Sequence, residues 1–114
     1  MTEEQKKRLD EQFAFLLEID KEKEVIRHTP ISSALRREND AEHSWHMAVM
    51  ALFLSEYSNE KIDLLHTMSM IIVHDLIEIY AGDTYAYDDA ALKGQHDRES
   101  IAAEKLFSLL PSDQ

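Results

Sequence analysis

The first part of the chain carries apolar residues every three or four positions, which predicts an amphipathic helix ending near Ile19. The residues that share this apolar face are Leu9, Phe13, Leu16 and Leu17. Thr2, followed three residues later by Gln5, matches a capping box and predicts the start of the helix. The charged segment 20–27 is expected to continue as a short second helix, before Pro30 and two serines break the pattern.

Two strongly apolar segments follow, and each predicts a helix that is buried on nearly every side. The first begins after Asn39 or Asp40, either of which is a good N-cap, and ends at about Ser58. Apolar residues lie on most of its other faces as well as on the stripe formed by Trp45, Ala48, Val49, Leu52 and Phe53. The second helix runs from about Lys61 to Tyr80, and Gly82 is its expected C-terminal stop.

A last helix is predicted near the end of the chain, with Asp97 as its N-cap and Pro111 as its stop. Its apolar face consists of Ala102, Leu106, Leu109 and Leu110. The chain has only 2 glycines and 2 prolines, and good helix formers are abundant, so the composition favours an all-α fold. A length of 114 residues without a repeat or a linker predicts a single domain over residues 1–114.

The charge balance limits the possible partners of this fold. The net charge is −11, from 23 acidic and 12 basic side chains, and such a surface repels a nucleic-acid backbone. We therefore expect no nucleic acid polymer as a partner. A small phosphorylated substrate needs only a local positive site, which a divalent metal ion and one or two arginines would supply.

Other bulk features point to the cytoplasm. The chain has no cysteine, which excludes disulfides and cysteine-ligated zinc and fits a reducing compartment. Its first residues lack the apolar core of a signal peptide, and no apolar stretch reaches the uninterrupted length of about 20 residues that spans a bilayer. We therefore expect a cytoplasmic protein with no membrane partner.

His74 and Asp75 stand out because they end the apolar run 64–73 and precede two more apolar residues. An imidazole and an ionised carboxylate in such surroundings cost free energy, and a bound cation would compensate both by taking them as ligands. Glu78, four residues after His74, lies on the same face of the expected helix. His43 opens the upstream apolar helix, so the pattern predicts a metal site between neighbouring helices. A buried network of imidazole and carboxylate without metal is the alternative.

Three motifs resemble those of the HD-domain superfamily and, within it, the bacterial 5′-deoxynucleotidase branch. They are Glu42-His43-Ser44, the apolar run ending in His74-Asp75, and Glu78-Ile79-Tyr80-Ala81-Gly82-Asp83. The resemblance covers about Arg27 to Asp83, half of the chain. It implies a compact HD-domain helical bundle and one divalent metal ion bound by His43, His74 and Asp75.

The resemblance also implies a reaction, which is the metal-dependent removal of the 5′-phosphate from (deoxy)nucleoside monophosphates. Glu78 and Asp83 match acidic residues that act near the reacting phosphate, and Arg27 matches a substrate-binding arginine. Histidine and carboxylate ligands do not identify the metal, which could be Co, Mn, Zn, Ni, Fe or Mg. The family resemblance further implies a homodimer.

The chain departs from the family at one metal ligand. Family members take a further aspartate from a downstream helix, and the late aspartates here, Asp97 and Asp113, lie in other contexts. The chain is therefore expected to lack the family's C-terminal helices, with water or another group in the fourth position. Two alternatives stay open, an HD-type hydrolase of another nucleotide and a non-catalytic metal-binding helical interaction module. His46 and His66 are interpreted as structural residues.

Overall fold

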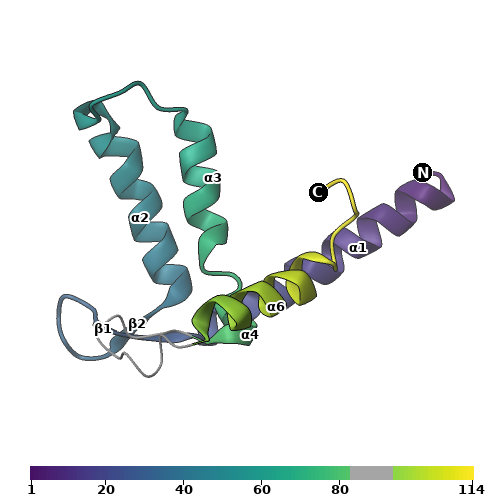
Figure 1. Cartoon of the computed structure of the whole chain (residues 1–114), viewed down its shortest axis with the longest axis horizontal. Helices are drawn as coiled ribbons and strands as arrows, with labels where there is room; N and C mark the ends of the chain where they lie inside the picture. Colours follow the sequence, from purple (N-terminus) through teal and green to yellow (C-terminus); the bar gives the residue numbers. More distant parts are fainter. Residues whose placement is uncertain (83–93) are drawn as a thin grey trace. The chain divides into compact units, whose positions relative to one another are not determined.

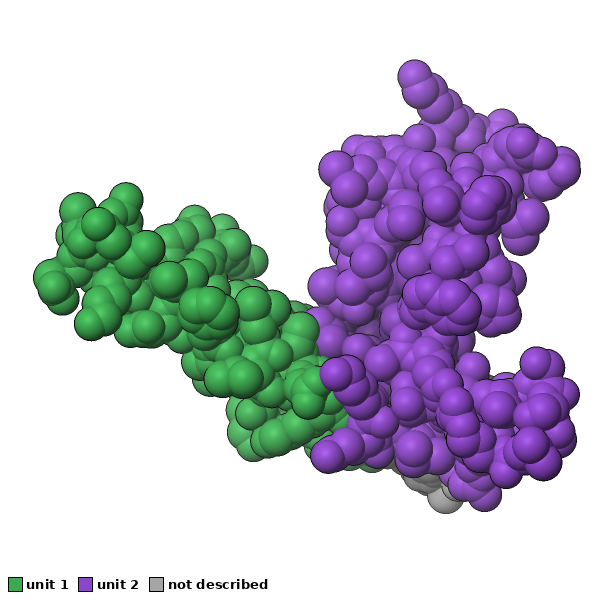
Figure 2. Space-filling model, turned by 180° about the vertical axis from the view of Figure 1, so that it is seen from behind, with its two compact units in different colours: residues 1–21, 77–114 green, residues 22–76 purple. Residues whose placement is uncertain are grey.

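The computed structural model describes residues 1–82 and 94–114, and most of the described residues are helical (Figure 1). In chain order the elements are α1 (Glu3–Ile19), the 3₁₀ helix η1 (Asp20–Glu24), β1 (Ile26–Pro30), β2 (Arg37–Asn39), α2 (Asp40–Leu54), the 3₁₀ helix η2 (Ser55–Tyr57), α3 (Leu64–His74), α4 (Glu78–Ala81) and α6 (Gln95–Phe107). They fall into two compact units, residues 1–21 with 77–114 and residues 22–76 (Figure 2). The all-α prediction is right for the helices but misses a small two-stranded sheet.

The first unit is built around α1, whose start is fixed by a reciprocal capping box, as predicted. The backbone N–H of Gln5 donates to Thr2 Oγ1 (3.1 Å), and the backbone N–H of Thr2 donates to Gln5 Oε1 (2.8 Å). Both bonds satisfy N–H groups that the helix start leaves without intrahelical partners. Phe15 is the buried residue of α1, and its ring centroid lies 6.2 Å from that of Phe107 in α6.

The start of α6 differs from the prediction. Gly94 is the N-cap, with a left-handed backbone at φ 75°, so the assignment of Asp97 as the cap is wrong. Asp97 lies in the first turn instead, where a carboxylate interacts favourably with the helix dipole. Ala102 and Leu106 are buried, as the apolar face of this helix predicted.

The second unit begins with a β-hairpin that the sequence did not predict. Its strands β1 and β2 pair antiparallel, and the register pairs are Ile26 with Asn39 and Pro30 with Arg37. Both strands are short and neither contains a buried residue, so they lack the apolar alternation that identifies a half-buried strand. The predicted helix over 20–27 is confirmed only as far as η1.

The helices α2 and α3 lie side by side in the second unit (Figure 1). Asn39 caps α2, as predicted, because the N–H of Glu42 donates to Asn39 Oδ1 and the N–H of Asn39 donates to Glu42 Oε1, both at 2.9 Å. The predicted burial on nearly every side is wrong, since α2 buries only three described residues and α3 buries none. Large apolar side chains exposed on the two helices include Trp45, Leu52, Phe53, Leu65, Met70 and Ile72.

The predicted continuous helix over 61–80 is also wrong, because α3 ends at His74. In a continuing helix the N–H of Asp75 would donate to the carbonyl of Ile71. That carbonyl instead accepts a hydrogen bond from Nδ1 of the His74 ring, and the N–H of Asp75 bonds to the carbonyl of Val73. The hydrogen bond from the His74 ring to Ile71 thus lies at the point where α3 ends.

The segment Leu64–Ala81 is apolar and long enough, judged by length and composition alone, to cross a membrane. The segment is 18 residues long, and the core helices of soluble proteins meet the same criterion. In the structure the segment consists of two helices, α3 and α4. Gly82, at φ 78°, follows α4 as its C-cap, which confirms the predicted stop.

Asn39→Ala removes the side-chain acceptor at the start of α2. We expect it to lower the free energy of unfolding by about 1 kcal/mol. Asn39→Ser keeps a capping oxygen and should retain most of the stability. Urea denaturation followed by circular dichroism measures both variants, and an equal loss in the two would show that the cap does not stabilise this helix.

Candidate metal centre

Three side chains predicted from the sequence converge where α2 begins and α3 ends. His43 lies one turn into α2, His74 is the last residue of α3, and Asp75 is its C-cap. The Oδ2 atom of Asp75 lies 3.1 Å from His74 Nε2 and 3.7 Å from His43 Nε2. One possible ligand atom from each residue lies within 4.8 Å of the other two. The fold therefore brings the predicted triad together.

The hydrogen bond of the His74 ring determines what faces Asp75. A carbonyl oxygen can only accept, so Nδ1 of His74 carries the proton that it donates to Ile71. The Nε2 of a neutral ring then carries a lone pair, which faces the Asp75 carboxylate oxygen across 3.1 Å. Two acceptors at this distance need a cation between them. A proton could bridge the carboxylate and only one imidazole, whereas a metal ion can be bound by both rings and the carboxylate together.

The burial of Asp75 supports the same conclusion. Only 7% of the residue is exposed, and its Oδ2 accepts no hydrogen bond from the described residues. A desolvated carboxylate oxygen without a hydrogen-bond donor costs free energy, which a bound cation would offset. Imidazole and carboxylate donors together suit divalent transition ions. The residues present therefore fit a bound metal ion better than a metal-free hydrogen-bonded network.

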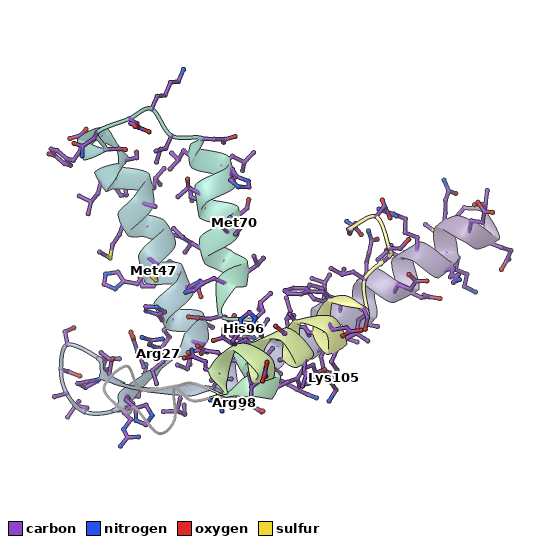
Figure 3. The ribbon with its side chains drawn as sticks, viewed as in Figure 1. Arg27, Met47, Met70, His96, Arg98 and Lys105 are labelled. Atoms are coloured by element: carbon purple, nitrogen blue, oxygen red, sulfur yellow. The ribbon has the colours of Figure 1, made fainter. Side chains whose placement is uncertain are left out.

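Arg27 of β1, labelled in Figure 3, places one guanidinium among several carboxylates. Its Nε lies 3.0 Å from Glu38 Oε1, and its Nη1 lies 3.8 Å from Asp40 Oδ1 and 3.8 Å from Asp75 Oδ2. Three carboxylates around one guanidinium leave an excess of negative charge, which a divalent cation would balance. The sequence indicated Arg27 but missed Glu38 and Asp40, although both flank the predicted N-cap.

Glu22 of η1 is a further buried carboxylate that the sequence missed, because it lies in a charged run typical of a solvated surface. Only 9% of the residue is exposed, and its Oε1 accepts no hydrogen bond from the described residues. Burial, followed by the charges of Asp40 and Asp75, raises the pKa of Glu22 to about 7. Glu22 therefore becomes charged near neutral pH, in a region that is already negative.

The sequence also predicted Glu78 and Asp83 as site residues. Glu78 begins α4, after the helix break at His74, so the prediction that these two side chains share a helical face is wrong. Asp83 lies outside the described residues. The ring of His46 stacks on that of Trp45, with centroids 6.1 Å apart. Among the described residues, the candidate ligand groups contain no histidines other than the two of the triad.

Glu22→Gln should change how stability depends on pH. A carboxyl group whose pKa rises from 4.5 to about 7 on folding binds its proton more tightly in the folded chain. The wild-type chain therefore loses stability as the pH rises through this interval. The variant does not titrate there, so we expect it to be about as stable as wild type near pH 4.5 and more stable by roughly 3 kcal/mol at about pH 8.

Chemical denaturation in EDTA at the two pH values measures this difference without a bound cation, which would lower the Glu22 pKa. Glu24→Gln is the matched control, because Glu24 lies in the same 3₁₀ helix but is exposed. If Glu22→Gln showed the same pH dependence as wild type, folding would not raise the pKa of Glu22.

Comparison with known proteins gives a family and a structural relative. The family model described as HD domain matches residues 19–114. The crystal structure of a predicted metal-dependent phosphohydrolase from Magnetospirillum magnetotacticum MS-1 is 48% identical in sequence to this chain. The match has a TM-score of 0.88 and covers 94% of this chain and 53% of that chain.

Two curated relatives are similar over part of their length. The 5′-deoxynucleotidase HDDC2 of Homo sapiens is 30% identical over 78 residues, which is 68% of this chain and 37% of the relative. The 5′-deoxynucleotidase of Shewanella oneidensis is 29% identical over 97 residues, 78% of this chain and 50% of the relative. The chain thus spans half or less of these relatives. Because the family model matches residues 19–114, well over half of the sequence, the chain belongs to the HD domain family.

Proposed function

We propose that this chain is a metal-dependent phosphomonoesterase that removes the 5′-phosphate from (deoxy)nucleoside monophosphates. The observation that carries the proposal is the convergence of two imidazole nitrogens on one buried carboxylate oxygen in an HD domain. Similarity to two proteins named 5′-deoxynucleotidases supports the substrate class. A chain of net charge −11 also needs a cation before it can accept a phosphate dianion.

In this proposal His43, His74 and Asp75 hold one divalent ion. When bound, the ion would lower the pKa of a coordinated water and neutralise charge on the phosphoryl oxygens. Three protein ligands leave coordination positions for water and substrate, as in other catalytic metal sites. The fourth position is proposed to take water or another group.

Arg27 is the proposed phosphate-binding residue. Its Nη1 lies 3.8 Å from Asp75 Oδ2, so the guanidinium is adjacent to the proposed ligand set. A guanidinium can donate two parallel N–H bonds to a phosphate, which positions the group as well as neutralising it. On binding, the phosphate oxygens would replace part of the contact between Arg27 and its carboxylate neighbours.

Glu78 and Asp83 are proposed to move the protons of the reaction. One carboxylate would orient the attacking water, and the other would protonate the leaving 5′-oxygen. The second role requires a carboxylic acid whose pKa is raised toward neutrality. Glu78 begins α4 shortly after the ligand residues, and Asp83 follows the C-cap Gly82.

A second candidate is a non-catalytic, metal-binding interaction module. It is favoured by the apolar side chains exposed on α2 and α3, such as Trp45, Phe53 and Leu65, which are 67%, 69% and 78% exposed. Large apolar side chains that are exposed near one another are typical of a surface that binds another protein. We also propose a cytoplasmic homodimer, whose partner subunit would be one such protein.

His74→Ala and Asp75→Ala should each abolish metal-dependent phosphate release, because each removes one of three ligands. Release is measured with metal-stripped protein to which Co, Mn, Zn or Mg is returned. The matched control is His66→Ala, which removes an exposed histidine from the same helix and should leave the rate unchanged. Full activity in the His74 or Asp75 variant would rule out the proposed ligand set.

A panel of 5′-deoxyribonucleotides and ribonucleotides, with nucleoside triphosphates and cyclic nucleotides added, tests the substrate class. We expect metal-dependent release from the monophosphates, with the deoxy compounds preferred. Turnover of another nucleotide class alone would favour a different HD-type hydrolase. A chelator-induced fall in melting temperature without any turnover would favour the interaction module.

A further inference from the structure

Glu38 lies next to the proposed metal centre without belonging to a candidate ligand group of the described residues. Its side chain is 16% exposed and directs one oxygen, Oε1, at two partners. This oxygen lies 3.5 Å from His43 Nδ1 and 3.0 Å from Arg27 Nε. One carboxylate therefore contacts a proposed metal ligand and the proposed phosphate-binding residue together.

The contact with His43 fixes how that ring can bind a metal. An imidazole that ligates through one nitrogen presents an N–H at the other, and this N–H needs an acceptor. Glu38 offers its oxygen on the Nδ1 side, while Nε2 faces Asp75 Oδ2 at 3.7 Å. His74 is supported differently, because its Nδ1 donates to a backbone carbonyl. A charged acceptor also makes the imidazole a stronger ligand.

The contact with Arg27 fixes the direction of the guanidinium. Its Nε is held by Glu38 at 3.0 Å, and its Nη1 then lies 3.8 Å from Asp40 and from Asp75. An arginine presents its donors in a rigid planar fork, so holding Nε aims the remaining N–H groups. Without this carboxylate, the long side chain of Arg27 would lose the contact that directs it toward the ligand set.

The hairpin supplies the backbone positions for these contacts. Arg27 lies on β1 and Glu38 on β2, each one residue from the register pair Ile26 and Asn39. Asn39 is the N-cap of α2, and His43 lies one turn further along the helix. The strand pairing and the capped first turn therefore place Glu38 between Arg27 and His43.

We propose that Glu38 is a positioning residue of this centre, which holds His43 Nε2 toward the metal ion and directs Arg27 toward the phosphate. The second half of this inference rests on the proposed function, whereas the first half concerns metal binding alone. The experiment is therefore titration calorimetry with Mn²⁺ or Co²⁺ as the probe, on the whole chain and without nucleotide.

Glu38→Ala should weaken Mn²⁺ or Co²⁺ binding about 10- to 100-fold, the usual effect of losing the partner of a ligating histidine. Glu38→Gln keeps an acceptor oxygen for the His43 ring and should recover part of the affinity. Glu56→Ala, which removes an exposed carboxylate in η2, is the matched control and should bind like wild type. The Co²⁺ absorption spectrum should change in Glu38→Ala, because the histidine ligand is displaced.

Wild-type affinity in Glu38→Ala would overturn the inference, as would equal losses in the Ala and Gln variants. If circular dichroism showed that Glu38→Ala does not fold, the comparison of Glu38→Gln with wild type would decide. Weaker Co²⁺ binding by Glu38→Gln with an unchanged Co²⁺ absorption spectrum would contradict a positioning role. If the wild-type chain bound metal but hydrolysed no nucleotide, the proposed function would be wrong, but the inference about metal binding would still hold.

Discussion

The structure of the second unit depends on the need for positive charge beside Asp75. This carboxylate is buried, and the Nε2 atoms of His43 and His74 face its Oδ2 at 3.7 Å and 3.1 Å. Asp75 is the buried member of the triad, and a cation among the three groups would offset the cost of its desolvation. The helix ends bring these groups together, since His43 lies one turn into α2 and α3 ends at His74, with Asp75 as its C-cap.

The same requirement explains the charges around the triad. Glu22, Glu38 and Asp40 add negative charge, and within this group Arg27 contributes one positive charge. Burial raises the pKa of Glu22 to about 7, and repulsion from Asp40 and Asp75 adds to this shift. A divalent ion would relieve this repulsion, and its remaining coordination positions would then attract a phosphate that the acidic surface repels. In the proposed function, metal binding and phosphate binding would thus be coupled through the same local charge.

Much of this site could be predicted from the sequence, because its strongest signals are local. The capping residues Thr2 and Asn39 and the His74-Asp75 pair after an apolar run depend on neighbours only a few positions away. The hairpin and the position of Glu38 depend on strand pairing across a loop, which the local sequence does not specify. The end of α3 involves a hydrogen bond between the His74 ring and the Ile71 carbonyl, which an apolar pattern does not reveal. The burial of α2 and α3 was overestimated, since an apolar sequence does not specify what packs against each face.

Anomalous X-ray diffraction from crystals grown with Mn²⁺ or Co²⁺ tests most directly whether His43, His74 and Asp75 bind one metal ion. We predict one strong anomalous peak within about 2.0–2.3 Å of the two Nε2 atoms and an Asp75 oxygen. Arg27 should lie beside the peak without coordinating it. A crystal that shows no peak there, with His74 hydrogen-bonded to Asp75 instead, would contradict the account and identify the cluster as a metal-free network.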